Sequence, residues 1–122
     1  MEAEINFLRI LSDPTRLKLL KLVLREELCV CELVEILRIT QPAVSQHMVK
    51  LKLLGLVRER RAGLWTYYRA DPAKVEAAMD RVVNLLYADI AEIQAMAPEW
   101  KRRQELKPRA PVCALKGSVA AL

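Results

Sequence analysis

The chain has 122 residues, of which 53% are hydrophobic and 29% are charged, and it carries a formal net charge of +5. This length predicts a single domain, and the composition excludes a wholly disordered or collagen-like chain. The longest stretch without Asp, Glu, Lys or Arg covers residues 39–49, which is too short for a membrane-spanning helix of about 20 apolar residues. Two glutamates stand near the N-terminus where a secretory signal would be positive, so we expect a cytoplasmic protein with no membrane partner.

The positive charge is concentrated in one part of the chain. Residues 38–69 contain seven Lys or Arg and one acidic residue, Glu59, whereas residues 1–37 and 71–98 are net negative. A localised basic segment on a nearly neutral domain is typical of proteins that bind nucleic-acid phosphates. A basic face that contacts only solvent is the alternative.

Three helices are predicted before residue 40. Ile5, Leu8 and Leu11 recur at helical spacing, and Asp13 followed by Pro14 predicts the start of a second helix. The expected buried face of the second helix consists of Leu17, Leu20, Val23 and Leu24. A third helix is expected over roughly residues 31–37, with these side chains directed inward: Leu33, Ile36 and Leu37.

A fourth helix over residues 41–54 is followed by a predicted β-hairpin. Thr40 is a suitable N-cap, and Gly55 suits the left-handed conformation after a helix end. The short connection between the third and fourth helices predicts a helix-turn-helix. Segments 56–59 and 65–69 are rich in β-branched and aromatic residues, so we expect two strands joined by a turn at residues 60–63.

A long helix is predicted to begin at Pro72 and to end before Pro98. Its apolar residues are spaced by three or four positions, close to the 3.5-residue repeat of paired helices: Val75, Met79, Val82, Leu86, Ile90 and Ile93. We expect this seam, with Ile5 and Leu8, to form a dimer interface, and burial against the chain's own core is the alternative. We therefore expect a domain over residues 1–97 and an irregular basic tail over residues 98–122.

One face of the fourth helix has the properties of a surface that contacts DNA bases. Gln46 can donate and accept at one base edge, Ser45 can pair with either kind of base, and Val49 can contact a thymine methyl group. Lysines beside such a face bind phosphates. The predicted DNA contacts on this helix are Gln41, Pro42, Ser45, Gln46, His47, Val49, Lys50 and Lys52. A polar helix face that is merely solvated is the alternative.

The hairpin supplies further predicted DNA contacts, which are Arg58, Arg60, Arg61 and Tyr68. The arginines would lie beside the DNA backbone or enter the adjacent minor groove. We expect the aromatic residues of the return strand to pack the hairpin onto the core, and these are Trp65, Tyr67 and Tyr68. One tyrosine hydroxyl is expected to be left free for phosphate. His47 is the only histidine, and we expect it to hydrogen-bond a neighbour or a phosphate rather than to bind a metal.

Three cysteines, Cys29, Cys31 and Cys113, are expected to be thiols available for metal or redox chemistry. Three thiolates suit As(III) or Sb(III), because a soft three-coordinate ion needs no fourth ligand, whereas Zn(II) or Cd(II) would need one such as Glu32. Residues two apart on a regular helix point about 200° apart, so the close pair can bind one ion only where the backbone is not helical. Cys113 could supply the third sulfur or be a spectator, and the pair could also be mere buried packing.

Four segments over residues 5–93 together resemble the ArsR/SmtB family of arsenic- and metal-responsive winged-helix repressors: LSDPTRLKLL, ELCVCEL, TQPAVSQHMVKLKLLGLV and GLWTYYR. The resemblance implies a mainly α-helical winged helix-turn-helix with a small β-hairpin wing. It also implies a homodimer, formed by the N-terminal helix and the long C-terminal helix, that leaves a partly palindromic DNA operator when a thiophilic metal or metalloid binds.

The resemblance extends to the cysteine pair with departures. Cys29 and Cys31 match the two cysteines of the family's inducer motif, but Val34 stands where arsenic-sensing members commonly have a third cysteine. Cadmium- and lead-sensing relatives add cysteines from an N-terminal extension, which has no counterpart in this sequence. Zinc- and nickel-type members use Asp and His along the last helix, and no histidine follows His47.

These observations predict a DNA-binding repressor that is released from its operator by As(III) or Sb(III) bound to cysteine thiolates. The binding of such an ion is expected to select or create a distorted turn at the start of the third helix. This would shift Ser45 and Gln46 against the DNA groove or change the angle between the two recognition helices of the dimer. A redox-responsive or a Cd(II)- or Pb(II)-responsive repressor is the alternative, and an interaction module that binds no DNA is another. The sequence has no Gly-rich phosphate loop and no nucleophile elbow, so we expect no enzyme.

Overall fold

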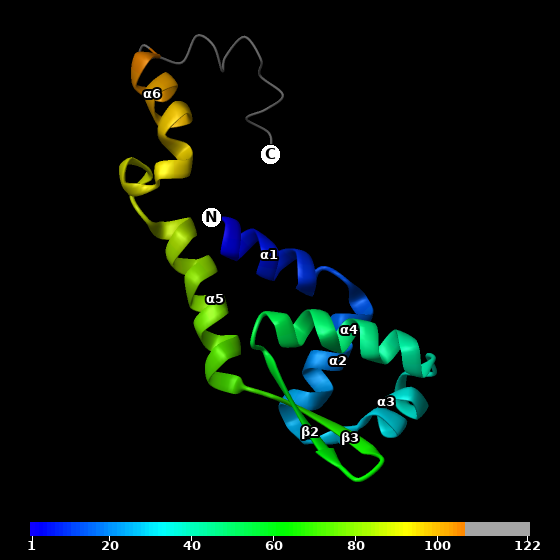
Figure 1. Ribbon diagram of the computed structural model, residues 1–122. Helices are drawn as coiled ribbons and strands as arrows, with labels where there is room; N and C mark the ends of the chain where they lie inside the picture. Colours follow the sequence, from blue (N-terminus) through cyan, green and yellow to red (C-terminus); the bar gives the residue numbers. More distant parts are fainter. Residues whose placement is uncertain (107–122) are drawn as a thin grey trace. The chain divides into compact units, whose positions relative to one another are not determined.

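The computed structural model describes residues 1–106 of a chain that divides into two units, residues 1–87 and residues 88–122. Figure 1 shows the elements in chain order. The first unit contains five helices and three strands: α1 (Glu2–Leu11), α2 (Pro14–Arg25), β1 (Leu28–Cys29), α3 (Val30–Leu37), α4 (Gln41–Leu53), β2 (Val57–Ala62), β3 (Trp65–Ala70) and α5 (Pro72–Tyr87). The described part of the second unit contains two 3-10 helices and one α-helix: η1 (Ile90–Glu92), η2 (Gln94–Met96) and α6 (Ala97–Glu105). No helix within residues 1–106 is both long and apolar enough to cross a membrane.

The helix-turn-helix forms as predicted, because local signals define α4 at both ends. The Thr40 hydroxyl accepts a hydrogen bond from the backbone N–H of Ala43 at 3.2 Å, and Gly55 adopts a φ of +74°. The predicted inward residues of α4 are all fully buried: Val44, Met48 and Leu51. The core beneath α4 is completed by other fully buried side chains: Leu19, Val23, Leu33 and Leu56.

The buried faces of α2 and α3 differ from the prediction. Leu17 and Leu24 of α2 are exposed. The side of the helix that faces the core is formed by Leu19, Leu20 and Val23 instead. Together with Arg16 they are the buried residues of α2, and their spacing of three, one and three positions places them on one face of the helix. In α3 Ile36 is half-exposed, whereas Leu33 is fully buried.

The three strands form one antiparallel sheet in the order β1-β3-β2. The hairpin is longer than predicted, because Ala62 pairs with Trp65 and the turn consists of Gly63 and Leu64 rather than residues 60–63. Gly63 has a φ of +62°, a conformation that glycine adopts readily in two-residue hairpin loops. Strand β1 was not predicted at all.

The C-terminal helix is shorter than predicted. α5 ends at Tyr87, and Asp89 caps η1 by accepting a hydrogen bond from the N–H of Ala91 at 3.0 Å. The predicted seam is therefore interrupted, and its last two positions, Ile90 and Ile93, do not continue α5.

The segment after Pro98 was predicted to be irregular, but its first part forms the helix α6. Pro98 lies in the first turn of α6, where proline is favoured because its missing N–H needs no partner. The proline that was predicted to follow a helix end therefore begins another helix.

Candidate DNA interface and thiol pair

The outward face of α4 presents the side chains that the sequence predicts to contact DNA. Six of them are exposed: Gln41, Pro42, Gln46, Val49, Lys50 and Lys52. Ser45 and His47 are half-buried at the edges of this face. Since the opposite side of α4 is fixed in the core by three fully buried residues, the orientation of the exposed face is fixed too.

The predicted DNA contacts on the wing, which is the hairpin of β2 and β3, are held by ion pairs. Arg60 donates two hydrogen bonds to the Glu27 carboxylate, at 2.7 and 3.1 Å, and its guanidinium lies 4.4 Å from the centre of the Tyr67 ring. Arg58 donates to Asp71 at 2.8 Å. The neighbouring guanidinium in each case holds the pKa of the Glu27 and Asp71 carboxyl groups below the usual range, mainly by hydrogen bonding.

Glu59 interrupts the basic surface formed by α4 and the wing. Its carboxylate accepts a hydrogen bond from Lys52 Nζ at 2.7 Å and one from Arg61 Nε at 3.1 Å. The hydrogen bond from Lys52 is the main cause of its lowered pKa, so Glu59 stays ionised at neutral pH. A DNA phosphate that binds Lys52 or Arg61 has to compete with this carboxylate.

We expect Glu59→Gln to strengthen DNA binding by about threefold to tenfold at low salt, because it removes a negative charge and frees two cations. The gain should diminish as salt rises, since salt screens exposed charges. The measurement is fluorescence anisotropy of a labelled duplex across a salt series. Glu76→Gln, on the exposed surface of α5, is the matched control. An equal effect of both substitutions would show that net charge, and not the position of Glu59, is responsible.

The aromatic residues of the wing differ in exposure. Tyr68 is 6% exposed, and burial raises the pKa of its hydroxyl group. This favours packing over phosphate binding for Tyr68, which is the least accessible of the predicted DNA contacts. Trp65 was expected to pack on the core, but it is 56% exposed near the tip of the hairpin.

The cysteine pair lies at the N-terminus of α3, where the backbone is already non-helical. Cys29 is the N-cap residue with extended backbone angles (φ −82°, ψ 160°), and Cys31 lies in the first helical turn. The two form a disulfide, with Cα atoms 5.4 Å apart, rather than the free thiols that we expected. The backbone at Cys29 is therefore not helical, which is the condition that the spacing of the pair requires for two sulfurs to meet. A further distortion of this turn by a bound ion stays a prediction.

Cys29 is tied to α3 and to the wing at the same time. Its N–H donates to the Glu32 carboxylate at 2.9 Å, and the N–H of Glu32 donates to Cys29 Sγ at 3.4 Å, which forms a capping box. In β1, Cys29 lies opposite Tyr67 of β3. The cysteine pair is therefore linked directly to the wing through β1. The sequence analysis did not predict this link.

Cys31 is the accessible member of the pair. Cys29 is 4% exposed, whereas Cys31 is exposed and lines an open groove of about 710 Å³. Other residues of the groove come from α4 and the wing: Ser45, Val49, Arg61 and Trp65. Reagents can thus reach Cys31 beside the exposed face of α4.

The described residues alone do not assemble a metal site of three or more ligands. Within residues 1–106 no cluster of three His, Cys, Asp or Glu side chains is arranged to bind a metal ion. The third predicted ligand, Cys113, lies outside the described residues. A two-sulfur site at Cys29 and Cys31 is what this part of the chain offers after the disulfide is reduced.

The predicted dimer seam is divided between core and surface. Val75 and Val82 pack partly against the core of their own chain, whereas Met79 and Leu86 are 48% and 75% exposed. On α1, which packs against α5, Ile5 and Leu8 are 43% and 49% exposed. Apolar side chains are thus exposed on two helices that contact each other, and their role as a dimer interface stays a prediction.

A helix-turn-helix that precedes a β-hairpin, with basic side chains on both, defines a winged helix-turn-helix transcriptional regulator. The family described as "Bacterial regulatory protein, arsR family" matches residues 13–59. The arsenic resistance transcriptional regulator ArsR1 of Pseudomonas putida is 37% identical over 108 residues, which are 84% of this chain and 80% of that protein. The chain belongs to the ArsR family, as the resemblance of its motifs implied.

Two further comparisons agree with this assignment. The arsenical resistance operon repressor of Escherichia coli K12 is 43% identical over 70 residues, which are 56% of this chain and 59% of that protein. The structure of reduced HlyU from Vibrio cholerae N16961 superposes with a TM-score of 0.58 at 31% identity, covering 72% of this chain and 92% of that one. The predicted winged helix-turn-helix fold is confirmed.

Proposed function

We propose that this chain is a repressor that binds a partly palindromic operator as a homodimer and leaves it when As(III) or Sb(III) binds the thiolates of Cys29 and Cys31. The observation that carries the proposal is the extended N-cap conformation of Cys29, which brings the two sulfurs together in a helix-proximal C-x-C motif. The names of the two curated relatives, which refer to arsenic resistance, support the choice of inducer.

The ion-binding form of the site is the reduced one. A dithiol reductant, which is itself oxidised to a disulfide, supplies the two electrons and two protons that convert the Cys29–Cys31 disulfide to two thiols. Arsenous acid then exchanges one hydroxyl group for each thiol sulfur, and each exchange releases one water molecule, which takes up the thiol proton. The N–H of Glu32, which donates to Cys29 Sγ, favours a negatively charged sulfur there. We propose Cys113 as the third ligand, because three-coordinate As(III) needs one more sulfur.

The proposed signal passes from the cysteine pair to both DNA-contacting elements. An ion on Cys29 Sγ competes for the lone pairs that accept the Glu32 N–H, so it weakens the capping box of α3. α3 packs against α4, and Cys29 lies opposite Tyr67 of the wing. Release from DNA follows only to the extent that the ion binds the DNA-incompetent arrangement more tightly.

We propose that the exposed face of α4 contacts bases in the major groove, with Gln46 and Ser45 bonding base edges and Val49 at a thymine methyl group. The lysines of α4 and the arginines of the wing bind phosphates. In the homodimer two such helices contact two half-sites, which accounts for a partly palindromic operator.

A redox-responsive repressor is the second candidate, and the disulfide between Cys29 and Cys31 favours it. The two functions are separated by titrating the chain on an operator selected from a random-sequence duplex pool. The reduced chain should release this DNA on addition of arsenite, while Cd(II) at the same concentration should release less. Peroxide in the absence of metalloid should leave the complex intact. Release by peroxide together with no response to arsenite would support the redox function instead.

A further inference from the structure

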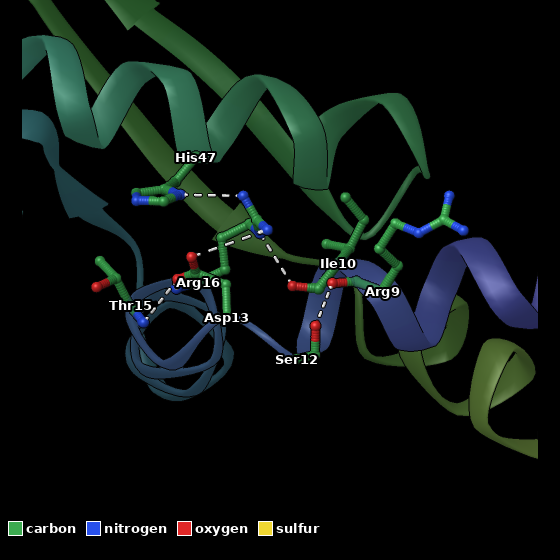
Figure 2. Close-up of polar contacts among 7 residues, drawn as sticks. All are labelled: Arg9, Ile10, Ser12, Asp13, Thr15, Arg16 and His47. Atoms are coloured by element: carbon green, nitrogen blue, oxygen red, sulfur yellow. Dashed lines mark hydrogen bonds and ion pairs between the residues drawn. The ribbon is translucent and has the colours of Figure 1, made fainter.

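Arg16 of α2 is the one charged side chain that is buried within residues 1–106, with 9% exposure. A buried cation is costly unless its N–H groups are paired. Its Nε donates to the Ile10 carbonyl at 2.9 Å, Nη2 lies 3.9 Å from the Asp13 carboxylate, and Nη1 lies 3.3 Å from His47 Nδ1 (Figure 2). No buried side-chain nitrogen or oxygen in the described residues lacks a partner.

Two of these contacts hold the guanidinium in place without His47. The Ile10 carbonyl is among the last four of α1, which have no partner inside the helix and favour a cation. Asp13 is the N-cap of α2, and its carboxylate also accepts the N–H groups of Thr15 and Arg16. The third contact therefore acts on His47 of α4 from a fixed position.

The contact determines which nitrogen of His47 carries the proton. A guanidinium has only N–H donors, so His47 Nδ1 has to accept, and a neutral imidazole then carries its proton on Nε2. Figure 2 shows the second ring nitrogen directed away from Arg16. Nε2 has no hydrogen-bond partner within residues 1–106. Because no side-chain nitrogen or oxygen there is both completely buried and unpaired, Nε2 of the half-buried His47 retains some solvent exposure.

We propose that Arg16 fixes this tautomer of His47, and that the Nε2–H group donates to a backbone phosphate of bound DNA. The proposal rests on the DNA-binding function stated above and adds a positioning role for Arg16. His47 follows Gln46 on α4, beside the face that we propose to contact bases. A phosphate contact reads no sequence, so it should contribute equally to the affinity for operator and for random duplex. A neutral N–H group releases no counterion, so the slope of affinity against salt concentration should be unchanged.

The tautomer is tested on the free full-length chain. His47 is the only histidine, so a long-range proton–nitrogen NMR spectrum of the imidazole needs no assignment by mutation. At a pH where the ring is neutral, we expect one tautomer with the proton on Nε2. A proton on Nδ1, or an equal mixture of tautomers, would overturn the proposed role of Arg16.

The phosphate contact is tested with two substitutions of the same residue. In His47→Gln the side-chain amide nitrogen replaces Nε2, whereas in His47→Asn it replaces Nδ1. We expect the Gln variant to keep its affinity within about threefold and the Asn variant to lose about tenfold on operator and random duplex alike. Equal affinities of the two variants, or a loss confined to the operator, would overturn the phosphate contact.

The failure of the underlying function gives a different result. If the unsubstituted chain bound neither duplex, the proposed function and the phosphate contact would both be wrong, and the NMR spectrum would still decide the tautomer. Circular dichroism of the two His47 variants verifies that each is folded before its affinity is compared.

Discussion

Cys31→Ser is expected to bind the operator as the unsubstituted chain does and to lose its release by arsenite. Cys31 is exposed in the first turn of α3, so a serine there is tolerated without a cavity. The serine oxygen is a poor ligand for a soft ion. The loss of a residue that only hydrogen-bonds a metal ligand already weakens metal binding by roughly 10- to 100-fold. Removal of a thiolate ligand itself should weaken arsenite binding by more than that.

Cys29→Ser is the companion variant, because serine is a strong N-cap residue and preserves the capping box with Glu32. Both variants are compared with the unsubstituted chain by anisotropy of labelled operator DNA, under reducing conditions, as arsenite is added. Cys113→Ser, measured in parallel, reports the proposed third ligand. A normal arsenite response in either Cys29→Ser or Cys31→Ser would exclude the pair as the sensor.

Leu86→Glu is expected to convert the proposed homodimer to monomers and to lower operator affinity by at least about a hundredfold. Leu86 is 75% exposed on α5, and the burial of a carboxylate in an apolar interface is strongly unfavourable. A monomer binds one half-site only, so it loses the gain from two linked contacts.

Sedimentation velocity over a range of concentrations measures this change, together with operator titrations of the same samples. Leu17→Glu is the matched control, since Leu17 is 51% exposed on α2, outside the proposed interface. A Leu86→Glu chain that sediments as a dimer and binds operator normally would show that the exposed surface of α1 and α5 is not the interface.

The parts of the structure that were predicted correctly depend on local signals. Thr40 as a cap, Gly55 after the helix end, and the spacing of Val44, Met48 and Leu51 act within α4 itself. These residues indicate the helix and its buried side without any information on tertiary contacts. The location of the predicted base-contacting face follows from them.

The features that were missed depend on contacts between distant residues. β1 has only two residues and exists through pairing with β3, which no local pattern reveals. The burial of Arg16 requires Ile10 and His47 to be in place around it.

The N-cap position of Cys29 could have been predicted from the sequence. Glu32 stands three positions after Cys29, which is the spacing of a capping box. The usual first residue of that motif is serine or threonine. The sequence analysis began the third helix near residue 31 and did not identify Cys29 as its N-cap. A cysteine N-cap explains how two sulfurs in a C-x-C motif can meet.

Arsenic K-edge X-ray absorption of the reduced chain, loaded with one equivalent of arsenite per subunit, would identify the atoms bound to the inducer. We expect a first shell of sulfur atoms in the unsubstituted chain. In the Cys29→Ser/Cys31→Ser double variant, oxygen neighbours should replace at least the two sulfur atoms that these residues supply. A sulfur shell that persists unchanged in the double variant would contradict the assignment of Cys29 and Cys31 as the sensor.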